Sequence, residues 1–306
     1  MPPFLTRPLL AAILLCAGCG PQAHEAFSEG PDRFRIIRQS LYNQIIVERD
    51  GDLVDLRFQT GHRVPRQTAV DLSDPERLVI PYTRTMLAAA LVQPEPRRIL
   101  QIGLGGGALN RYLRLAWPEA HLTTVELDGA VRDVAVEYMG FRPDDRDRVV
   151  VEDGRAFVRK NSDLWDWILV DAYREGSVPP HLKTREFYTL LKDRLAPGGV
   201  VALNLHRGNR LFASDQATLR AVFPEVHLFA VPGTGNAVAL AFAGPAPDFA
   251  RLTPDTFLPE RHAVKTLPDH LAQALRNHSG AVTETQATIL TDDFSPAEFL
   301  QNQNAE

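Results

Sequence analysis

The chain has 306 residues, of which 44% are hydrophobic and 23% charged, which is enough for one large globular domain or a large domain with a smaller one. A formal net charge of -5 and a pI near 6.0 exclude a globally basic surface, so we expect no nucleic acid partner.

The N-terminal segment predicts an export signal. Arg7 precedes an apolar run from Leu9 to Ala17 that is too short to span a bilayer and is followed by small residues. Residues 1–18 resemble a bacterial lipoprotein signal with Cys19 as the lipidated residue, although Cys16 stands where such signals usually carry an aliphatic residue. Another export signal or a harmless apolar tail stays open at this stage.

Lipidation at Cys19 would place the protein in the cell envelope of a bacterium, exported and held at the membrane only through its lipid anchor. Without the signal the expected location is the cytoplasm. Both cysteines of the chain lie in this segment, so the mature protein would keep none for a disulfide or a cysteine-based site.

The next segments predict a tether and a small β domain. Residues 19–33 are polar and contain Pro and Gly, which is typical of a tether. Residues 34–93 then contain short β-rich runs, two of them separated by "RDGD", which predicts a hairpin. The apolar spacing of residues 81–93 predicts a helix, ended by the prolines of "PEP".

Residues 94–249 predict a class I methyltransferase-like, Rossmann-like α/β domain. Seven strand-like runs alternate with helical runs, and this pattern indicates a parallel sheet covered on both faces. The last two runs are joined by the short Gly-rich turn of "AVPGTGNAVALAFA", which predicts an antiparallel edge hairpin. We expect residues 250–306 to form a mixed helix and loop tail.

Ligands of such sheets bind at the carboxyl ends of the strands, and the first two strands end in suitable residues. The first is followed by a turn with Gly103, Gly105, Gly106 and Gly107, where backbone could approach a ligand closely. Glu126 ends the second strand about twenty residues later, a position at which a carboxylate can accept both hydroxyls of a ribose. Glu126 could instead be an acid at the N-terminus of the next helix, but the neighbouring Asp128 fits that position better.

The third and fourth strands also deliver carboxylates. Asp153 and Gly154 follow the third strand, where Asp153 could accept from an adenine amino group or cap the next helix. Asp171 ends the fourth strand, beside the glycine turn. Three carboxylates at consecutive strand ends and a glycine turn together predict one crevice for a nucleoside.

These segments resemble the spermidine synthase family of aminopropyltransferases. The resemblance rests on "SLYNQIIV", "ILQIGLGGG", "TTVELDGAV", "VEDGRAFV", "WDWILVDAY" and "EFYTLLKDRLAPGGVVALNL". It implies a small β domain before a methyltransferase-like domain, and decarboxylated S-adenosylmethionine as co-substrate. It further implies Asn43, the glycine turn, Glu126 and Asp153 with Gly154 as co-substrate ligands, Asp171 as the base, and Tyr173 as a residue that helps to place the nucleophile.

The chain departs from the family at the acceptor. Arg174 stands where the family carries a second Asp, and Tyr82, Thr83, Arg84 stand where its pattern ends in Glu. We therefore assign Tyr82, Arg84 and Arg174 to the substrate site, with a potential that disfavours putrescine unless Glu175 or the acids of "LTDDF" replace the lost carboxylates.

The acids of "LTDDF", Asp292 and Asp293, have a second interpretation. They could instead lie in a solvated turn before a helix that begins near Ser295. His62, His121, His181 and His206 show no metal-ligand spacing, so we expect no metal and treat these histidines as surface or core residues.

Three functions stay open from the sequence. The first is aminopropyl transfer to a small-molecule amine or another nucleophile. The second is methyl transfer from intact S-adenosylmethionine, and the third is a non-catalytic, nucleoside-binding envelope lipoprotein. A homodimer is compatible with each of them.

Overall fold

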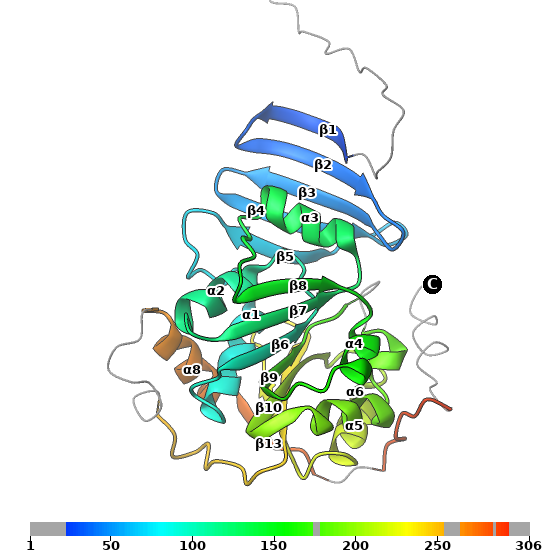
Figure 1. Ribbon diagram of the computed structural model, residues 1–306, viewed down its shortest axis with the longest axis vertical. Helices are drawn as coiled ribbons and strands as arrows, with labels where there is room; N and C mark the ends of the chain where they lie inside the picture. The colour runs from blue at the N-terminus through cyan, green and yellow to red at the C-terminus, as the bar shows by residue number, and fades with distance from the viewer. Residues whose placement is uncertain (1–22, 174–177, 254–263, 284–285, 294–306) are drawn as a thin grey trace, which may run out of the picture.

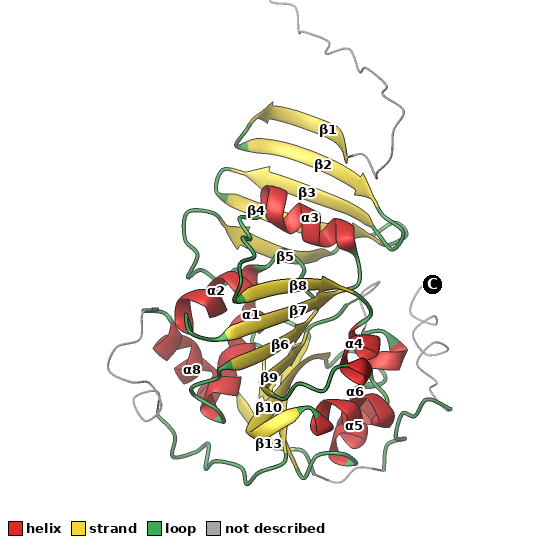
Figure 2. Cartoon of the chain, in the orientation of Figure 1, coloured by secondary structure: helices red, strands yellow, loops and turns green. Residues whose placement is uncertain are grey.

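The computed structural model describes residues 23–173, 178–253, 264–283 and 286–293. Two sheets organise this part of the chain, an antiparallel one near the N-terminus and a mixed one covered by helices on both faces (Figures 1 and 2). No helix within these ranges is long and apolar enough to cross a membrane.

The N-terminal sheet has five strands in chain order, and every neighbouring pair is antiparallel. The strands are β1 (Ala23–Gly30), β2 (Arg33–Gln39), β3 (Gln44–Asp50), β4 (Leu53–Gln59) and β5 (Arg66–Asp71). The predicted "RDGD" hairpin joins β3 to β4, with Asp50 opposite Leu53. Along β4 every second side chain, including those of Val54 and Leu56, is apolar and buried on one face of the sheet.

The tether prediction for residues 19–33 is wrong over β1. Residues 23–30 pair with β2 through backbone hydrogen bonds, with register shifts between Glu25 and Phe27 and between Ser28 and Gly30. An edge strand gains its hydrogen bonds from the neighbouring backbone, so a polar composition does not prevent pairing.

The second sheet has eight strands in the order β13-β11-β12-β10-β9-β6-β7-β8. They are β6 (Arg98–Ile102), β7 (His121–Glu126), β8 (Asp147–Val151), β9 (Trp165–Val170), β10 (Leu195–His206), β11 (Glu225–Ala230), β12 (Asn236–Phe242) and β13 (His278–Ala281). The seven predicted strands are present, and β11 and β12 form the predicted antiparallel hairpin. The predicted helix and loop tail contributes the additional strand β13, which pairs with β11.

Helices cover the mixed sheet on both faces (Figure 1). They are α1 (Pro81–Met86), η1 (Leu87–Leu91), α2 (Ala108–Ala116), α3 (Gly129–Tyr138), α4 (Gly154–Lys160), η2 (Pro180–Leu182), α5 (Arg185–Asp193), α6 (Phe212–Arg220) and α8 (Leu267–Arg276). One apolar cluster joins α1, η1, α2 and α8 to the sheet, and another joins α4, α5 and α6 to its other face. The two-sided cover explains why the strands are continuously apolar.

Helix α3 connects the two sheets. Its residues Val131 and Val134 are buried against Ile45 and Val47 of β3, and Figure 1 shows the helix lying across the N-terminal sheet. The glycine turn and β5 also touch, since the amide of Gly106 donates to the Thr68 hydroxyl at 3.1 Å. The N-terminal sheet is therefore packed against the carboxyl ends of the parallel strands of the mixed sheet.

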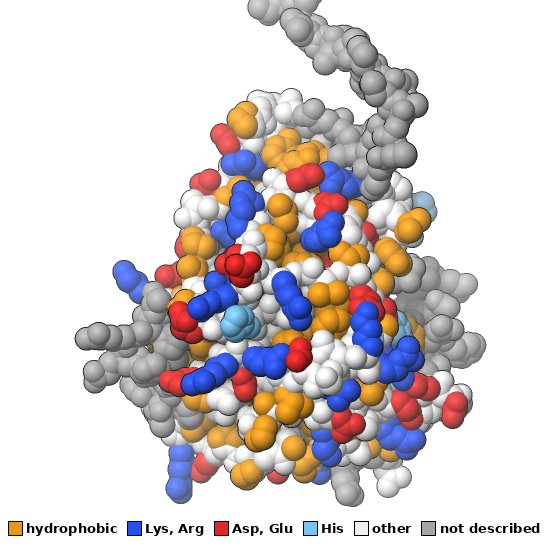
Figure 3. Space-filling view, viewed as in Figure 1, with side chains coloured by type: hydrophobic (Ala, Val, Ile, Leu, Met, Phe, Trp, Pro, Cys, Tyr) orange, Lys and Arg blue, Asp and Glu red, His pale blue; other side chains and the backbone are white. Residues whose placement is uncertain are grey.

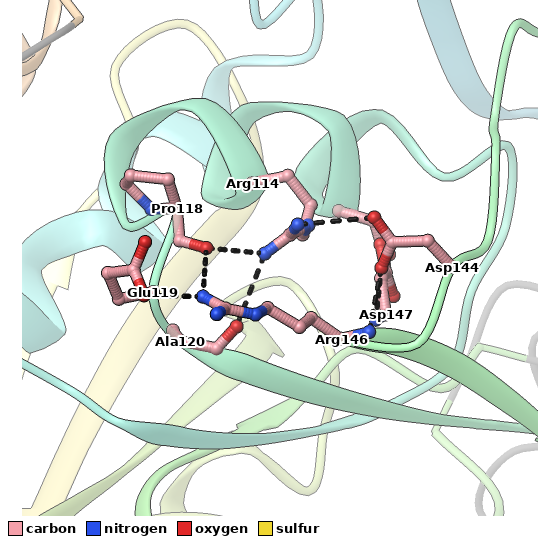
Figure 4. A network of polar contacts seen from close by, with 8 residues as sticks. Arg114, Pro118, Glu119, Ala120, Asp144, Arg146 and Asp147 are labelled. Atoms are coloured by element: carbon pink, nitrogen blue, oxygen red, sulfur yellow. Dashed lines mark hydrogen bonds and ion pairs between the residues drawn. The ribbon is translucent and has the colours of Figure 1, made fainter.

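A polar network closes the amino-terminal ends of β7 and β8 (Figure 4). Arg114 of α2 donates to the Pro118 carbonyl at 2.9 Å and to the Asp144 carboxylate at 3.2 Å. Arg146 reaches the same carbonyl at 3.3 Å and pairs with Glu119 at 2.6 Å. Basic and acidic side chains are likewise interspersed over the face shown in Figure 3.

Candidate active site

A cavity of about 400 Å³ lies at the carboxyl ends of the parallel strands. Residues at the carboxyl ends of β6, β7, β8, β9 and β10 line one side, and Phe58, Gln67 and Thr68 of the N-terminal sheet line the other. Its volume lies within the range of about 300–1,000 Å³ that is typical of small-ligand sites. The cavity therefore occupies the place at which ligands bind in open α/β sheets.

Asp171 is held at the end of the central strand β9. Because β6, β9 and β10 run parallel and in register, Gly103, Asp171 and Asn204 lie abreast. Oδ1 of Asp171 accepts from the Asn204 amide and Oδ2 accepts from the Tyr82 hydroxyl, each at 2.9 Å. Each oxygen keeps a further lone pair for a proton donor in the cavity.

Burial raises the pKa of Asp171, and the hydrogen bonds from Asn204 and Tyr82 oppose this shift. A raised pKa makes the carboxylate a stronger base. Tyr82 itself stays a neutral donor, because burial and the negative charge of Asp171 raise its pKa. The arrangement can thus orient a carboxylate and receive a proton at a defined place.

Tyr173 also lines the cavity. Its hydroxyl donates to the backbone carbonyl of Asn204 at 3.2 Å, and its pKa is raised chiefly by burial. The Asn236 amide donates to Oδ1 of Asn204 at 2.9 Å, which fixes the orientation of the amide that serves Asp171. Two neighbouring strands thereby support the carboxylate.

The glycine turn contributes only part of what the sequence predicts. Gly103 and Gly105 line the cavity, whereas Gly106 and Gly107 do not. A Cβ at Gly103 would lie 2.3 Å from the backbone oxygen of Asp171, so the strands could not approach each other as they do. Gly107 has φ of 71° at the N-cap of α2 and packs against Phe141, which is a steric role in the turn.

Glu126 lies where the sequence predicts a ribose ligand. Its carboxylate lines the cavity and accepts from the amides of Leu104 at 2.9 Å and Asp128 at 3.0 Å. Burial raises its pKa, while the amide hydrogen bonds lower it. These amides fix the carboxylate at the cavity wall, and the remaining lone pairs can accept two hydroxyls.

Asp128 has the predicted capping role and a second one. It accepts from the amide of Ala130 at the start of α3, and its other oxygen accepts from the Asn43 side chain at 3.0 Å and from Ser40. Asn43 lines the cavity, but its amide nitrogen is engaged by Asp128. One hydrogen of this amide is thus taken, and its second hydrogen and the side-chain oxygen are left for the predicted role as a ligand.

Asp153 has the capping role that the sequence allows, and its second oxygen contacts a histidine. Oδ1 caps α4 by accepting from Ala156 at 2.8 Å, and Oδ2 lies 2.8 Å from Nε2 of His181. Asp153, Gly154 and His181 all line the cavity. His181 and His206, both treated as surface or core residues from the sequence, belong to the lining.

Arg84 does not belong to the site, contrary to the sequence prediction. Its guanidinium donates to the carbonyls of Leu78 at 2.7 Å and Val79 at 3.4 Å, outside the cavity lining. Residues two apart on a helix differ by about 200° in direction, so Tyr82 and Arg84 cannot face the same cavity. The sequence predicts a positive potential at the substrate site from two arginines, and Arg84 is not one of the residues that could supply it.

Several other predicted residues have different outcomes. Arg174, Glu175 and Cys19 lie outside the described residues. Asp292 pairs with Arg155 through both oxygens, and neither Asp292 nor Asp293 lines the cavity. Within the described ranges no group of three His, Cys, Asp or Glu side chains could hold a metal ion.

Asn204 and Thr68 are site residues that sequence reasoning missed. Asn204 had a usable signal, because it is a polar residue near the end of an apolar strand, as Asp171 is. Thr68 had none, because only the packing of the N-terminal sheet brings it to the glycine turn.

The comparisons with known proteins agree with this geometry. Residues 80–234 match the spermine/spermidine synthase domain family. The chain is 33% identical to a polyamine aminopropyltransferase of Vibrio vulnificus over 311 residues, which cover 96% of this chain and 98% of that relative.

Solved structures show the same fold. A probable spermidine synthase from Corynebacterium glutamicum has a TM-score of 0.64 at 20% identity and covers 90% of this chain and 98% of its own. A spermidine synthase in complex with the transition-state analogue AdoDATO has a TM-score of 0.58 at 22% identity, covering 85% and 94% of the two chains.

Proposed function

The chain belongs to the spermine/spermidine synthase family, and we propose that it transfers an aminopropyl group from decarboxylated S-adenosylmethionine to the nitrogen of an amine. The observation that carries this proposal is the placement of Asp171 between Tyr82 and Asn204 at the end of the central strand. The relatives named above support aminopropyl transfer as the activity of the family.

The cavity lining fits the nucleoside of such a donor. Glu126 would accept the ribose hydroxyls, and Asp153 with Gly154 would face the base. Gly103 lies so close to the backbone of Asp171 that no side chain fits at this position, so backbone alone forms this part of the cavity wall. These residues supply binding and orientation, which is the main task when the leaving group is already activated.

The reaction needs one proton acceptor. A lone pair on the amine nitrogen attacks the aminopropyl carbon next to the sulfonium, the carbon–sulfur bond breaks, and its electrons leave on methylthioadenosine as a neutral thioether. The protonated amine has a pKa of about 10, so at neutral pH it must lose a proton to present that lone pair. Asp171 would take this proton, and Tyr82 and Asn204 would hold the carboxylate in place.

Methyl transfer from intact S-adenosylmethionine finds less support. That donor carries an additional carboxylate, for which a cation would be the natural partner. Arg66 is the one Lys or Arg among the described lining residues, and its guanidinium already lies 2.7 Å from Asp55. We therefore favour the decarboxylated donor.

Calorimetric titration with decarboxylated S-adenosylmethionine, S-adenosylmethionine and methylthioadenosine tests this proposal. We expect the first and third to bind, and methylthioadenosine to form in step with an aminopropylated product when amines are added. An acceptor panel of diamines, monoamines and amino acids would identify the nucleophile. Binding of none of the three nucleosides, or methyl transfer alone, would refute the proposal.

A matched pair of variants links binding to the predicted ribose ligand. Glu126→Ala removes a carboxylate from the cavity wall and should weaken methylthioadenosine binding by about tenfold to a hundredfold, because hydrogen bonds to charged groups contribute about 1.5–3 kcal/mol. Glu152→Ala is the control, since Glu152 pairs with Lys160 and does not line the cavity. Equal losses in both variants would contradict the assignment.

A further inference from the structure

One wall of the cavity is formed by the start of α4 and by η2, and it has an outer support. Asp153 and Gly154 come from α4, and His181 and Leu182 come from η2. The two short elements are joined at the cavity by the contact between Asp153 and His181. Both elements are anchored in one apolar cluster by Phe157, Val158 and Leu182, whereas polar contacts link their ends beside the cavity.

Arg155 supplies that outer connection. It belongs to α4, and its Nη1 donates to the backbone carbonyl of His181 at 3.1 Å and to the Thr184 hydroxyl at 3.4 Å. The same guanidinium donates to both oxygens of Asp292, through Nη1 at 2.7 Å and through Nη2. The pKa of Asp292 is lowered, first by this hydrogen bond from Arg155. A planar guanidinium with two bonds to one carboxylate has a fixed direction.

Asp292 lies in a segment, residues 286–293, that we call the C-terminal strap. Leu290 fixes the strap through three further contacts. Its side chain is fully buried beside Leu211, its amide donates to Thr218 at 2.9 Å, and its carbonyl accepts from the amide of Arg185 at 2.8 Å. It passes α5 and α6 (Figure 1).

The strap also holds Asp292 in position along the chain. The amide of Asp292 donates to Glu186 of α5 at 3.0 Å. The carboxylate is therefore presented to Arg155 by a backbone that is hydrogen-bonded at Leu290 and at Asp292 itself.

We infer that the C-terminal strap is a latch which positions the nucleoside-binding wall, with Asp292 and Arg155 as its positioning pair. It acts through the guanidinium, which ties α4 to η2 and so sets the distance between Asp153 and His181. Neither residue of the pair touches the cavity, which separates this role from ligand binding. The inference rests on the proposed function only for the identity of the nucleoside.

Hydrogen exchange without any ligand tests the latch directly. The amides of Leu182 and Lys183 are bonded to the carbonyls of Pro179 and Pro180, so their exchange reports on η2. Asp292→Ala should speed their exchange by about tenfold, because the turn loses its outer support. Asp293→Ala is the matched control, since this neighbouring exposed acid lies outside the pair. Unchanged exchange in Asp292→Ala would overturn the inference, as would an equal change in the control.

Methylthioadenosine binding then tests the link to the cavity. Asp292→Ala should raise the dissociation constant by about fivefold to tenfold while kcat at saturating donor stays within about twofold, since each factor of ten is about 1.4 kcal/mol. Asp292→Glu, which keeps a carboxylate for the Arg155 guanidinium, should retain most of the affinity that Asp292→Ala loses. An unchanged dissociation constant in Asp292→Ala would overturn the positioning role. If the unaltered protein binds no nucleoside but its exchange follows Asp292, the proposed function fails and the latch itself stands.

Discussion

Tyr82 donates its hydroxyl hydrogen to Oδ2 of Asp171 over 2.9 Å, although the two residues stand 89 positions apart in the chain. One comes from the helix after the N-terminal sheet and the other from the central strand of the mixed sheet. The carboxylate is thus oriented by a helix that packs on the mixed sheet and by the neighbouring strand β10.

Replacement of Asp171 tests its role as the base. Asp171→Asn keeps the shape of the side chain but cannot take a proton, so turnover should fall by about 10²–10⁴-fold. Methylthioadenosine affinity should stay within about threefold, because the nucleoside ligands are other residues. Initial rates of methylthioadenosine formation and calorimetric titration measure the two effects. Turnover that survives the substitution would remove Asp171 from the base role.

Tyr82→Phe should alter the pH dependence of the reaction. The hydrogen bond from Tyr82 lowers the pKa of Asp171, so its loss raises that pKa further and moves the acid limb of the kcat/KM profile to higher pH. We expect turnover to fall about tenfold.

Arg84→Gln is the control on the same helix, since Arg84 lies outside the cavity lining. The acid limb should stay in place in this variant, and rates measured from pH 5 to pH 9 decide the matter. A shift of similar size in both variants would mean that the effect comes from the helix and not from the hydroxyl.

The Asp147→Asn variant should gain stability relative to the native protein as the pH rises. Asp147 is 1% exposed, and burial raises its pKa from 3.8 to about 6. Because the folded-state pKa exceeds the unfolded one, the native protein loses stability as the pH rises from about 4 through about 6. Asn carries no charge and can still accept from Asn110. The stability of the variant relative to the native protein should therefore increase by roughly 1 kcal/mol between pH 5 and pH 7.5 in urea unfolding.

Asp144→Asn provides the comparison for this measurement. The pKa of Asp144 is lowered, first by a backbone hydrogen bond from Arg146, so the group is ionised at both pH values. Its stability difference from the native protein should be the same at pH 5 and at pH 7.5. A constant difference for Asp147→Asn as well would show that its carboxylate is ionised in the folded state throughout this range.

The lipoprotein-like signal predicts a covalent modification. Expression in a bacterium with radiolabelled palmitate should label the native protein in the membrane fraction, and Cys19→Ala should lose the label because no other cysteine follows it. Cys16→Ala should keep it. Label that persists in Cys19→Ala would refute the predicted site.

The strand ends could be predicted because they follow from local patterns. Apolar runs fix where each strand stops, and parallel strands bring their ends to one edge, so the sequence predicts one crevice for Glu126, Asp153 and Asp171, and all three line the cavity. β1 was not predictable in this way, because an edge strand takes its order from a neighbouring backbone.

Side-chain direction was less accessible from the sequence. The motif assigns Arg84 to the substrate site, whereas the short helix turns it away from Tyr82. The sequence allows Asp292 to be an acceptor ligand or a solvated acid, whereas the fold brings it to Arg155, 137 positions away. Contacts over such separations depend on tertiary packing, which no local pattern records.

The contact of Thr68 with the glycine turn couples the two sheets at the cavity. Gln67 and Thr68 bring the N-terminal sheet to the cavity, while Asp171 stands on the other sheet. The width of the cavity therefore depends on how the two sheets pack, and a larger side chain at position 68 would displace the glycine turn as well as narrow the cavity.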